Sequence, residues 1–178
     1  MFITNHVLAG AIAGSVCKRR PVRAFVLGFA THVVMDMTPH WGNTELGRDG
    51  FYAVAKRDGV LGLAAMSVIT VAGVPPRTAL LAGMAGAAIL DSDKPGEFFF
   101  GVNPLPGWLD RFHKEIQRES PEGMRVEVPV GVALAAVAGA LLVRARRRRS
   151  RSGASGAGRS DPRLASRGSV PTITGSAR

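Results

Sequence analysis

Five apolar stretches, separated by polar segments, are the feature that most constrains the fold of this 178-residue chain. A surface helix of a soluble bundle alternates apolar and charged residues with a period near 3.6 residues, and the stretches show almost no charged face of this kind. They are rich in Ala, Val, Leu and Gly, as in helices that contact one another through small residues. The stretches cover residues 1–17, 24–38, 60–74, 78–90 and 128–143. We therefore predict an all-α bundle of about five short, mostly transmembrane helices.

The chain divides into a helical membrane domain, residues 1–145, and a basic tail, residues 146–178. The tail consists largely of Ser, Gly and Arg and has too little apolar surface to fold, so we predict that it is disordered. Within the domain, residues 42–58 are expected to form a loop. The longer connection 91–125 contains one amphipathic helix. The spacing of Gly10 and Gly14 suits a close contact between helices.

The apolar stretches are short for membrane helices. A bilayer core takes about 20 apolar residues, with a range of roughly 17 to 25, and residues 78–90 fall below this range. The stretch that starts at Ala24 reaches a spanning length only by including His32 and Asp36. A soluble helical metalloprotein with a basic, nucleic-acid-binding tail is therefore an alternative interpretation.

The net charge of +10 is concentrated beside the apolar stretches. Residues 18–23 contain four basic side chains, residues 144–151 contain six arginines, and Arg77 separates the third and fourth stretches. If all five stretches span, these positions lie on one side, and positively charged loops stay in the cytoplasm. This predicts a multi-pass protein of the inner (cytoplasmic) membrane with a cytoplasmic C-terminus. The expected partner is membrane lipid and no specific nucleic acid, and the oligomeric state stays open.

The same topology gathers the polar residues of the apolar stretches and their outer connections on the opposite side. This group contains all four histidines of the chain. Its members are His6, His32, Asp36, His40, Asp58, Asp91, Asp93 and His113. Because function was not used to derive the topology, this convergence is an independent indication of a site.

His32 and Asp36 are four residues apart, so they share one face of a helix. His40 continues the same spacing just after Pro39, where the helix is expected to end. Imidazole and carboxylate groups in this arrangement suit a divalent metal such as zinc, manganese or iron. The structural alternatives are an Asp36–His32 pair, Asp58 as a helix cap, and a turn formed by the acids before Pro95.

The pattern TNHVLAGAIAG, then GFATHVVMDMTPHW, then an apolar helix ending in LDSD resembles the bacterial membrane-bound metal-dependent hydrolases. The HxxxD element is also similar to the helix-borne ligands of zinc-dependent phospholipases C. The resemblance covers roughly residues 3 to 120, and a second HxxxE or HxxxD pair of the phospholipases is missing. It implies a ligand set of His6, His32, Asp36, His40, Asp91 and His113.

From these observations we expect a membrane-bound hydrolase that uses a divalent metal, with zinc the favoured ion. Water activated by the metal would attack an ester or phosphoester of a small molecule or lipid. Asp58 or Asp93 would act as general base. The alternative is a non-catalytic small integral membrane protein in which the polar cluster is structural.

Overall fold

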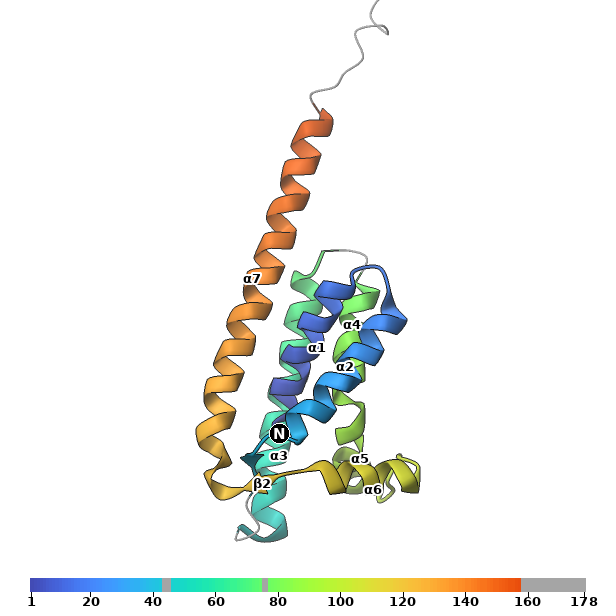
Figure 1. Ribbon diagram of the computed structural model, residues 1–178, viewed down its shortest axis with the longest axis vertical. Helices are drawn as coiled ribbons and strands as arrows, with labels where there is room; N and C mark the ends of the chain where they lie inside the picture. Colours follow the sequence, from blue (N-terminus) through green and yellow to red (C-terminus); the bar gives the residue numbers. More distant parts are fainter. Residues whose placement is uncertain (43–45, 75–76, 158–178) are drawn as a thin grey trace, which may run out of the picture.

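The computed structural model describes residues 1–42, 46–74 and 77–157, and most of these residues are helical (Figure 1). The long helices are α1 (Ile3–Cys17), α2 (Pro21–Asp36), α3 (Gly47–Ala72), α4 (Thr78–Ala88), α6 (Gly107–Ile116) and α7 (Met124–Ala157). Short turns follow α4 as η2 (Ile89–Ser92), α5 (Asp93–Pro95) and η3 (Gly96–Phe100). The parallel two-residue strands β1 (His40–Trp41) and β2 (Glu119–Ser120) pair with each other, and η4 (Pro121–Gly123) precedes α7. The predicted all-helical class is confirmed.

Glycines bring α1, α2 and α4 into backbone contact at the centre of the bundle. A Cβ atom added at Gly10 would collide with the carbonyl oxygen of Gly83, and one added at Gly14 would collide with the backbone of Ala79 and Leu80. A Cβ at Gly28 of α2 would also meet the Gly83 oxygen. The close contact predicted from the spacing of Gly10 and Gly14 is therefore present, with α4 as the partner.

The apolar core lies between α1, α3 and α4. Its buried members are Val7, Ala11, Ile69, Leu80 and Met84. Leu142 of α7 packs against this cluster from one side. The core is narrow because the central helices approach one another through small residues, so many larger apolar side chains stay on the outside of the bundle.

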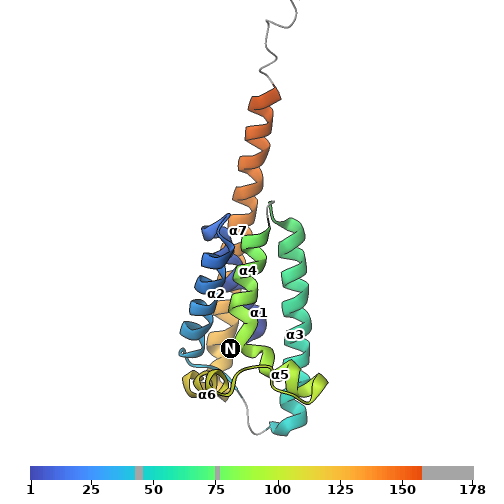
Figure 2. The same cartoon turned by 90° about the vertical axis from the view of Figure 1, so that its right-hand side faces the viewer.

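The two ends of the bundle differ in charge (Figures 1 and 2). The α1–α2 connection and the start of α4 lie at one end, and α7 continues past it with its arginines. We call this the basic end. The N-terminus, β1, α5 and α6 lie at the other end, the polar end (Figure 1). The two groups of connections that the sequence placed on opposite sides therefore lie at opposite ends of the bundle.

The predicted number of membrane helices is wrong. Among the described residues only one helical segment, Pro121–Ser152, is long and apolar enough to cross a membrane, and an 18-residue window within it has a mean hydropathy of 2.2. The apolar helix α1 has only 15 residues, α2 has 16 and α4 has 11. Prolines mark both limits of α2. Pro21 is its first residue, and the helix ends three residues before Pro39.

Two expected boundaries also move. Residues 47–58, predicted as part of a loop, are the first turns of α3. Residues 146–157, predicted as disordered, continue α7 to Ala157, because arginine is a good helix former and the helix is already nucleated. The remainder of the predicted tail, residues 158–178, lies outside the described residues.

Candidate metal centre

Imidazole and carboxylate side chains from four separate elements meet at the polar end of the bundle. The group comprises His6 of α1, His32 and Asp36 of α2, Asp91 of η2 and His113 of α6, and we call it the His/Asp cluster. The three histidines and Asp36 are 0% exposed, and Asp91 is 7% exposed. Buried ionisable groups are costly unless they pair or bind a cation, so this convergence needs a physical explanation.

Asp36 is the centre of the cluster. Its Oδ1 lies 3.1 Å from Nε2 of His6. Its Oδ2 lies 3.0 Å from Nε2 of His32 and 3.1 Å from Nε2 of His113. The Nε2 atoms of His32 and His113 are 3.2 Å apart, and the amino group of Met1 lies 2.9 Å from Asp36 Oδ1. Three imidazole nitrogens thus face one carboxylate.

Asp91 closes the cluster from the end of α4. Its Oδ2 lies 3.7 Å from Nε2 of His6, and its Oδ1 lies 4.0 Å from Nε2 of His113. Two overlapping sets of ligand atoms have all their members within 4.8 Å of one another. They are His6–His32–Asp36 and His32–Asp91–His113.

Local structure explains how the cluster residues on α1, α2 and η2 reach this point. His32 and Asp36 are one turn apart on the last part of α2, where the helix ends before Pro39. The 3₁₀ turn η2 continues α4 and directs Asp91 inward. His6 lies in the first turns of α1, and the backbone contact between Gly10 and Gly83 holds α1 against α4.

His113 arrives by a different route, through the long connection before α7. The predicted amphipathic helix is present as α6, which buries His113 and leaves Trp108 66% exposed. After α6 the chain pairs with the segment that follows α2: the Arg118 amide donates to the Asp36 carbonyl at 3.1 Å, and β2 pairs with β1. This pairing anchors the connection beside the end of α2.

The backbone fixes the tautomer of His32. Its Nδ1 lies 2.6 Å from the carbonyl oxygen of Ala87, and because a carbonyl only accepts, Nδ1 must carry the proton. A neutral His32 therefore presents the lone pair of Nε2 toward Asp36 and His113. A lone pair that faces a carboxylate at 3.0 Å is repulsive unless a proton or a metal ion lies between them.

Several buried cluster atoms have no hydrogen-bond partner among the described residues. They are Nδ1 and Nε2 of His6, Oδ2 of Asp91 and Nδ1 of His113. Ligands bound tetrahedrally at about 2.1 Å from zinc lie roughly 3.4 Å from one another. The separations of 3.0 to 4.0 Å within the cluster bracket that value. The donor types and their spacing fit a divalent cation.

The two members of the His/Asp cluster outside α1 and α2, Asp91 and His113, have displaced pKa values. Burial raises the pKa of Asp91, but the charges of Lys94 and His6 outweigh it and hold the pKa well below its usual range. Burial lowers the pKa of His113, and the contact with Asp36 together with the nearby carboxylate of Asp93 overcomes this effect and raises the pKa to about 9. Without a metal, His113 therefore holds a proton that a bound cation would displace.

His40 lies outside the His/Asp cluster. It is buried, and its Nδ1 donates to the carbonyl oxygen of Thr38 at 2.8 Å. Its Nε2 lies 4.0 Å from Oε1 of Glu119. Within the described part of the chain it belongs to neither set of converging ligand atoms. The i+4 spacing is lost because the helix ends at Asp36.

The two acids predicted as general base lie in different surroundings. Asp58 accepts hydrogen bonds from the Ile3 amide at 2.5 Å and the Thr4 hydroxyl at 2.6 Å, so it caps α1. Asp58 therefore has the capping role that was the structural alternative, but it caps α1 and not α3, the helix that contains it. Asp93 accepts from the Lys94 amide at 2.7 Å, and its Oδ2 lies 3.7 Å from Nδ1 of His113. That position orients an imidazole ring.

Sequence reasoning missed three residues around the cluster. Lys94 lies 2.6 Å from Oδ1 of Asp91, and the side-chain amide of Gln117 lies 3.0 Å from Nε2 of His113. Glu127 is buried and accepts from the Phe2 amide at 3.1 Å and the Asn5 side chain at 2.7 Å. The sequence did contain a signal for each of them. Lys94 is three residues after Asp91, and Gln117 is four residues after His113. Glu127 is an acid at the start of an apolar stretch.

No family model, curated protein or solved structure matches this chain.

Proposed function

We propose that this protein is a membrane-bound hydrolase that uses a divalent metal to cleave an ester or phosphoester, with zinc as the favoured ion. The observation that carries this proposal is the convergence of buried imidazole and carboxylate groups with unpartnered atoms at the polar end. The donor set of histidine and aspartate is one that zinc, manganese and iron(II) accept.

The surroundings of the cluster support metal binding. Histidine ligands usually donate their second ring nitrogen to a carbonyl or carboxylate, which orients the ring. His32 does so with Ala87, and Asp93 lies 3.7 Å from Nδ1 of His113. Both rings therefore direct Nε2 toward Asp36, as ligands of one ion would.

A divalent ion held here would lower the pKa of a bound water toward neutrality. In the hydrolysis, the water oxygen forms a bond to the carbonyl carbon or phosphorus, and the ester oxygen leaves with a proton. Asp93 keeps His113 oriented, and the ammonium group of Lys94 beside Asp91 provides positive charge for an anionic group. Asp58 is less suited to act as base because its carboxylate caps α1.

The membrane location is part of the same proposal. The apolar window of α7 is only 11% buried within the bundle, and Val60, Leu63 and Val71 of α3 are each more than 60% exposed. Lipid would cover these surfaces. With its arginines in the cytoplasm, α7 would place the His/Asp cluster at the outer end of an inner-membrane protein, with the shorter helices immersed beside it.

Metal content tests this proposal directly. Purified wild-type protein is expected to contain about one zinc per chain after exchange into metal-free buffer, measured by inductively coupled plasma mass spectrometry. His32→Gln should lose it, whereas the control Glu115→Gln on the exposed face of α6 should keep it. Wild-type protein without stoichiometric metal after reconstitution with zinc, manganese or iron(II) would overturn the proposal.

The non-catalytic alternative has one observation in its favour. Asp36 lies within 3.1 Å of three imidazole nitrogens and the Met1 amino group, and in this alternative protons on these groups satisfy its carboxylate without a metal. In that case chelators would leave the thermal unfolding midpoint unchanged. If the cluster binds a metal, chelation would instead lower the thermal unfolding midpoint by several degrees, because a cation that binds only the folded state stabilises that state.

A further inference from the structure

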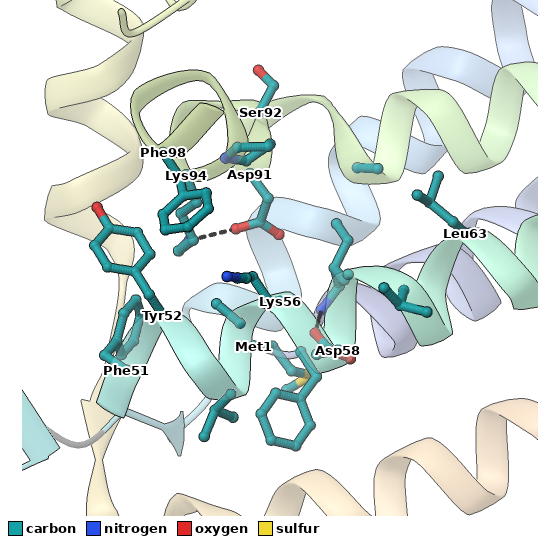
Figure 3. A pocket seen from close by; sticks show the side chains of 18 of the residues that line it. Met1, Phe51, Tyr52, Lys56, Asp58, Leu63, Asp91, Ser92, Lys94 and Phe98 are labelled. Carbon is teal, nitrogen blue, oxygen red and sulfur yellow. Dashed lines mark hydrogen bonds and ion pairs between the residues drawn. The ribbon is translucent and has the colours of Figure 1, made fainter. Parts of the chain in front are cut away.

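A second feature of the polar end, beside the His/Asp cluster, is a pocket of about 560 Å³ between the N-terminus, α3 and the turns after α4. We call it the apolar pocket (Figure 3). Its volume lies within the range of small-molecule sites, and apolar and aromatic side chains dominate such sites. The apolar and aromatic residues that line it include Ile3, Trp41, Phe51, Leu63, Phe98 and Phe99.

The apolar pocket and the His/Asp cluster share Asp91. This residue lines the pocket, and its unpartnered Oδ2 lies 3.7 Å from Nε2 of His6. Figure 3 shows the Asp91 carboxylate extending into the pocket between Tyr52 and Leu63. A molecule bound in the pocket would therefore have one end at the cluster.

Two cations line the pocket close to this shared residue. Lys94 pairs with Asp91 at 2.6 Å, and Nζ of Lys56 lies 4.5 Å from the ring centroid of Phe98. Of the acids in the lining, Asp58 is engaged by α1, and Glu119 is 35% exposed and faces His40. The Asp91 carboxylate offsets one of the two lysines beside it, so one positive charge is left to complement an anionic group.

The aromatic wall of the pocket continues onto the surface. Along η3 the exposed fraction rises from 40% at Phe98 to 65% at Phe99 and 78% at Phe100. Exposed aromatic side chains in a row are typical of protein surfaces that meet the membrane interface. An amphiphile could pass from a lipid layer along this wall into the pocket without exposing its chain to water.

We propose that the apolar pocket binds the alkyl chain of an anionic ester or phosphoester lipid and holds its headgroup at Asp91, beside Lys56 and Lys94. This inference rests on the proposed function, since it names the substrate class of the same site. The chain lies against α3 and η3, and the bond to be cleaved lies next to the His/Asp cluster.

Trp41 provides a native reporter, because it lines the pocket and the other tryptophan, Trp108, lies on the exposed face of α6. The experiment uses full-length Trp108→Phe protein in phosphatidylcholine nanodiscs and follows the quenching of Trp41 fluorescence by 12-bromododecyl phosphate. The neutral 12-bromododecanol serves as the uncharged probe. We expect the phosphate to reach half-maximal quenching at a concentration about tenfold or more below the concentration that the alcohol requires.

Gly59 offers a variant that should fold normally. It lines the pocket, and a Cβ atom added there meets nothing within 4 Å. Gly59→Phe should narrow the pocket and weaken quenching by the phosphate about tenfold, as expected when a few methylene groups lose their contacts. The matched control is Gly139→Phe on α7, where an added Cβ also meets open space, and it should behave as wild type.

Zinc content is measured on the same samples, and it separates this inference from the proposed function. Equal quenching in the Gly59→Phe and Gly139→Phe proteins, or equal quenching by the two probes, would overturn the substrate assignment even if zinc is bound. Selective quenching without any bound metal would overturn the hydrolase proposal and leave an anionic-lipid site.

Discussion

The two ends of the bundle are both rich in ionisable residues, yet they use them in opposite ways. At the polar end, charged and imidazole groups from distant elements turn inward, are buried and contact one another. At the basic end, the arginines of α7 are exposed. One of them, Arg146, donates to the Ala72 carbonyl at 2.7 Å. A hollow of about 500 Å³ at this end is lined in part by four exposed cations, Lys18, Arg19, Arg144 and Arg148.

This difference shows that the amount of charge is a poor guide to chemistry. Exposed cations that share one end can orient a protein against an anionic membrane surface, and for that purpose their relative positions matter little. A metal centre requires defined distances between ligand atoms, which only buried groups on packed elements provide. The following substitutions test whether the two ends differ in this way.

The largest effect is expected for Asp36→Asn. The change removes the carboxylate that faces three imidazole nitrogens, so zinc binding should be abolished. Loss of one partner from a buried ionic group costs about 3 kcal/mol or more, which corresponds to a fall of roughly 6 to 12 °C in the unfolding midpoint. Mass spectrometry and differential scanning fluorimetry measure the two quantities. The control, Glu115→Gln, alters an exposed acid on α6 and should change neither. Zinc retention by Asp36→Asn would remove this residue from the centre.

A smaller effect is expected for Asp93→Asn. Asp93 does not contact the converging ligand atoms directly but lies beside Nδ1 of His113. Loss of such a supporting carboxylate typically weakens metal affinity roughly 10- to 100-fold. Competition with a fluorescent zinc chelator measures this affinity, and Glu97→Gln on the exposed η3 turn is the control. An unchanged affinity would show that His113 is oriented by α6 alone, or that it is not a ligand.

The smallest effect on the metal is expected at the basic end. Combined replacement of Arg147, Arg148 and Arg149 by Gln should leave zinc content unchanged and alter stability by less than about 0.5 kcal/mol. The substitution should instead change the membrane topology, because each basic residue near an anionic membrane surface contributes about 1 kcal/mol to the attraction that keeps it on that side. A reporter fused after Arg178 should change from fully cytoplasmic to mixed orientation. A change in zinc content, or a periplasmic reading for the wild type, would contradict the proposed division between the ends.

Local spacing predicted part of this arrangement. The i+4 spacing of His32 and Asp36 and the grouping of the connections at two ends follow from helical periodicity and alternating direction, which depend only on neighbouring residues. His6, Asp91 and His113 were identified because the same topology placed them at one end. The amphipathic character of residues 108–120 predicted α6.

What sequence reasoning missed depends on contacts between distant residues. Asp58 caps α1 and Glu127 holds the start of α1 and β1, and nothing near either acid in the chain indicates its partner. Among the described residues His40 belongs to neither converging set of ligand atoms, because the helix ends at Asp36. The number of membrane helices was overestimated because apolar composition does not reveal where a helix stops.

The backbone contact between Gly10 and Gly83 has a consequence for how mutations at a distance act on the ligands. His6 precedes Gly10 by one helical turn, and Asp91 follows Gly83 by about two turns. A shift of α1 along α4 by one residue corresponds to about 1.5 Å, several times the tolerance of a metal–ligand bond of about 0.2 Å. Gly83→Ala would thus misalign His6 and Asp91 without altering either residue. A search for variants that do not retain zinc should therefore recover glycines in the middle of the bundle as well as His6 and Asp91.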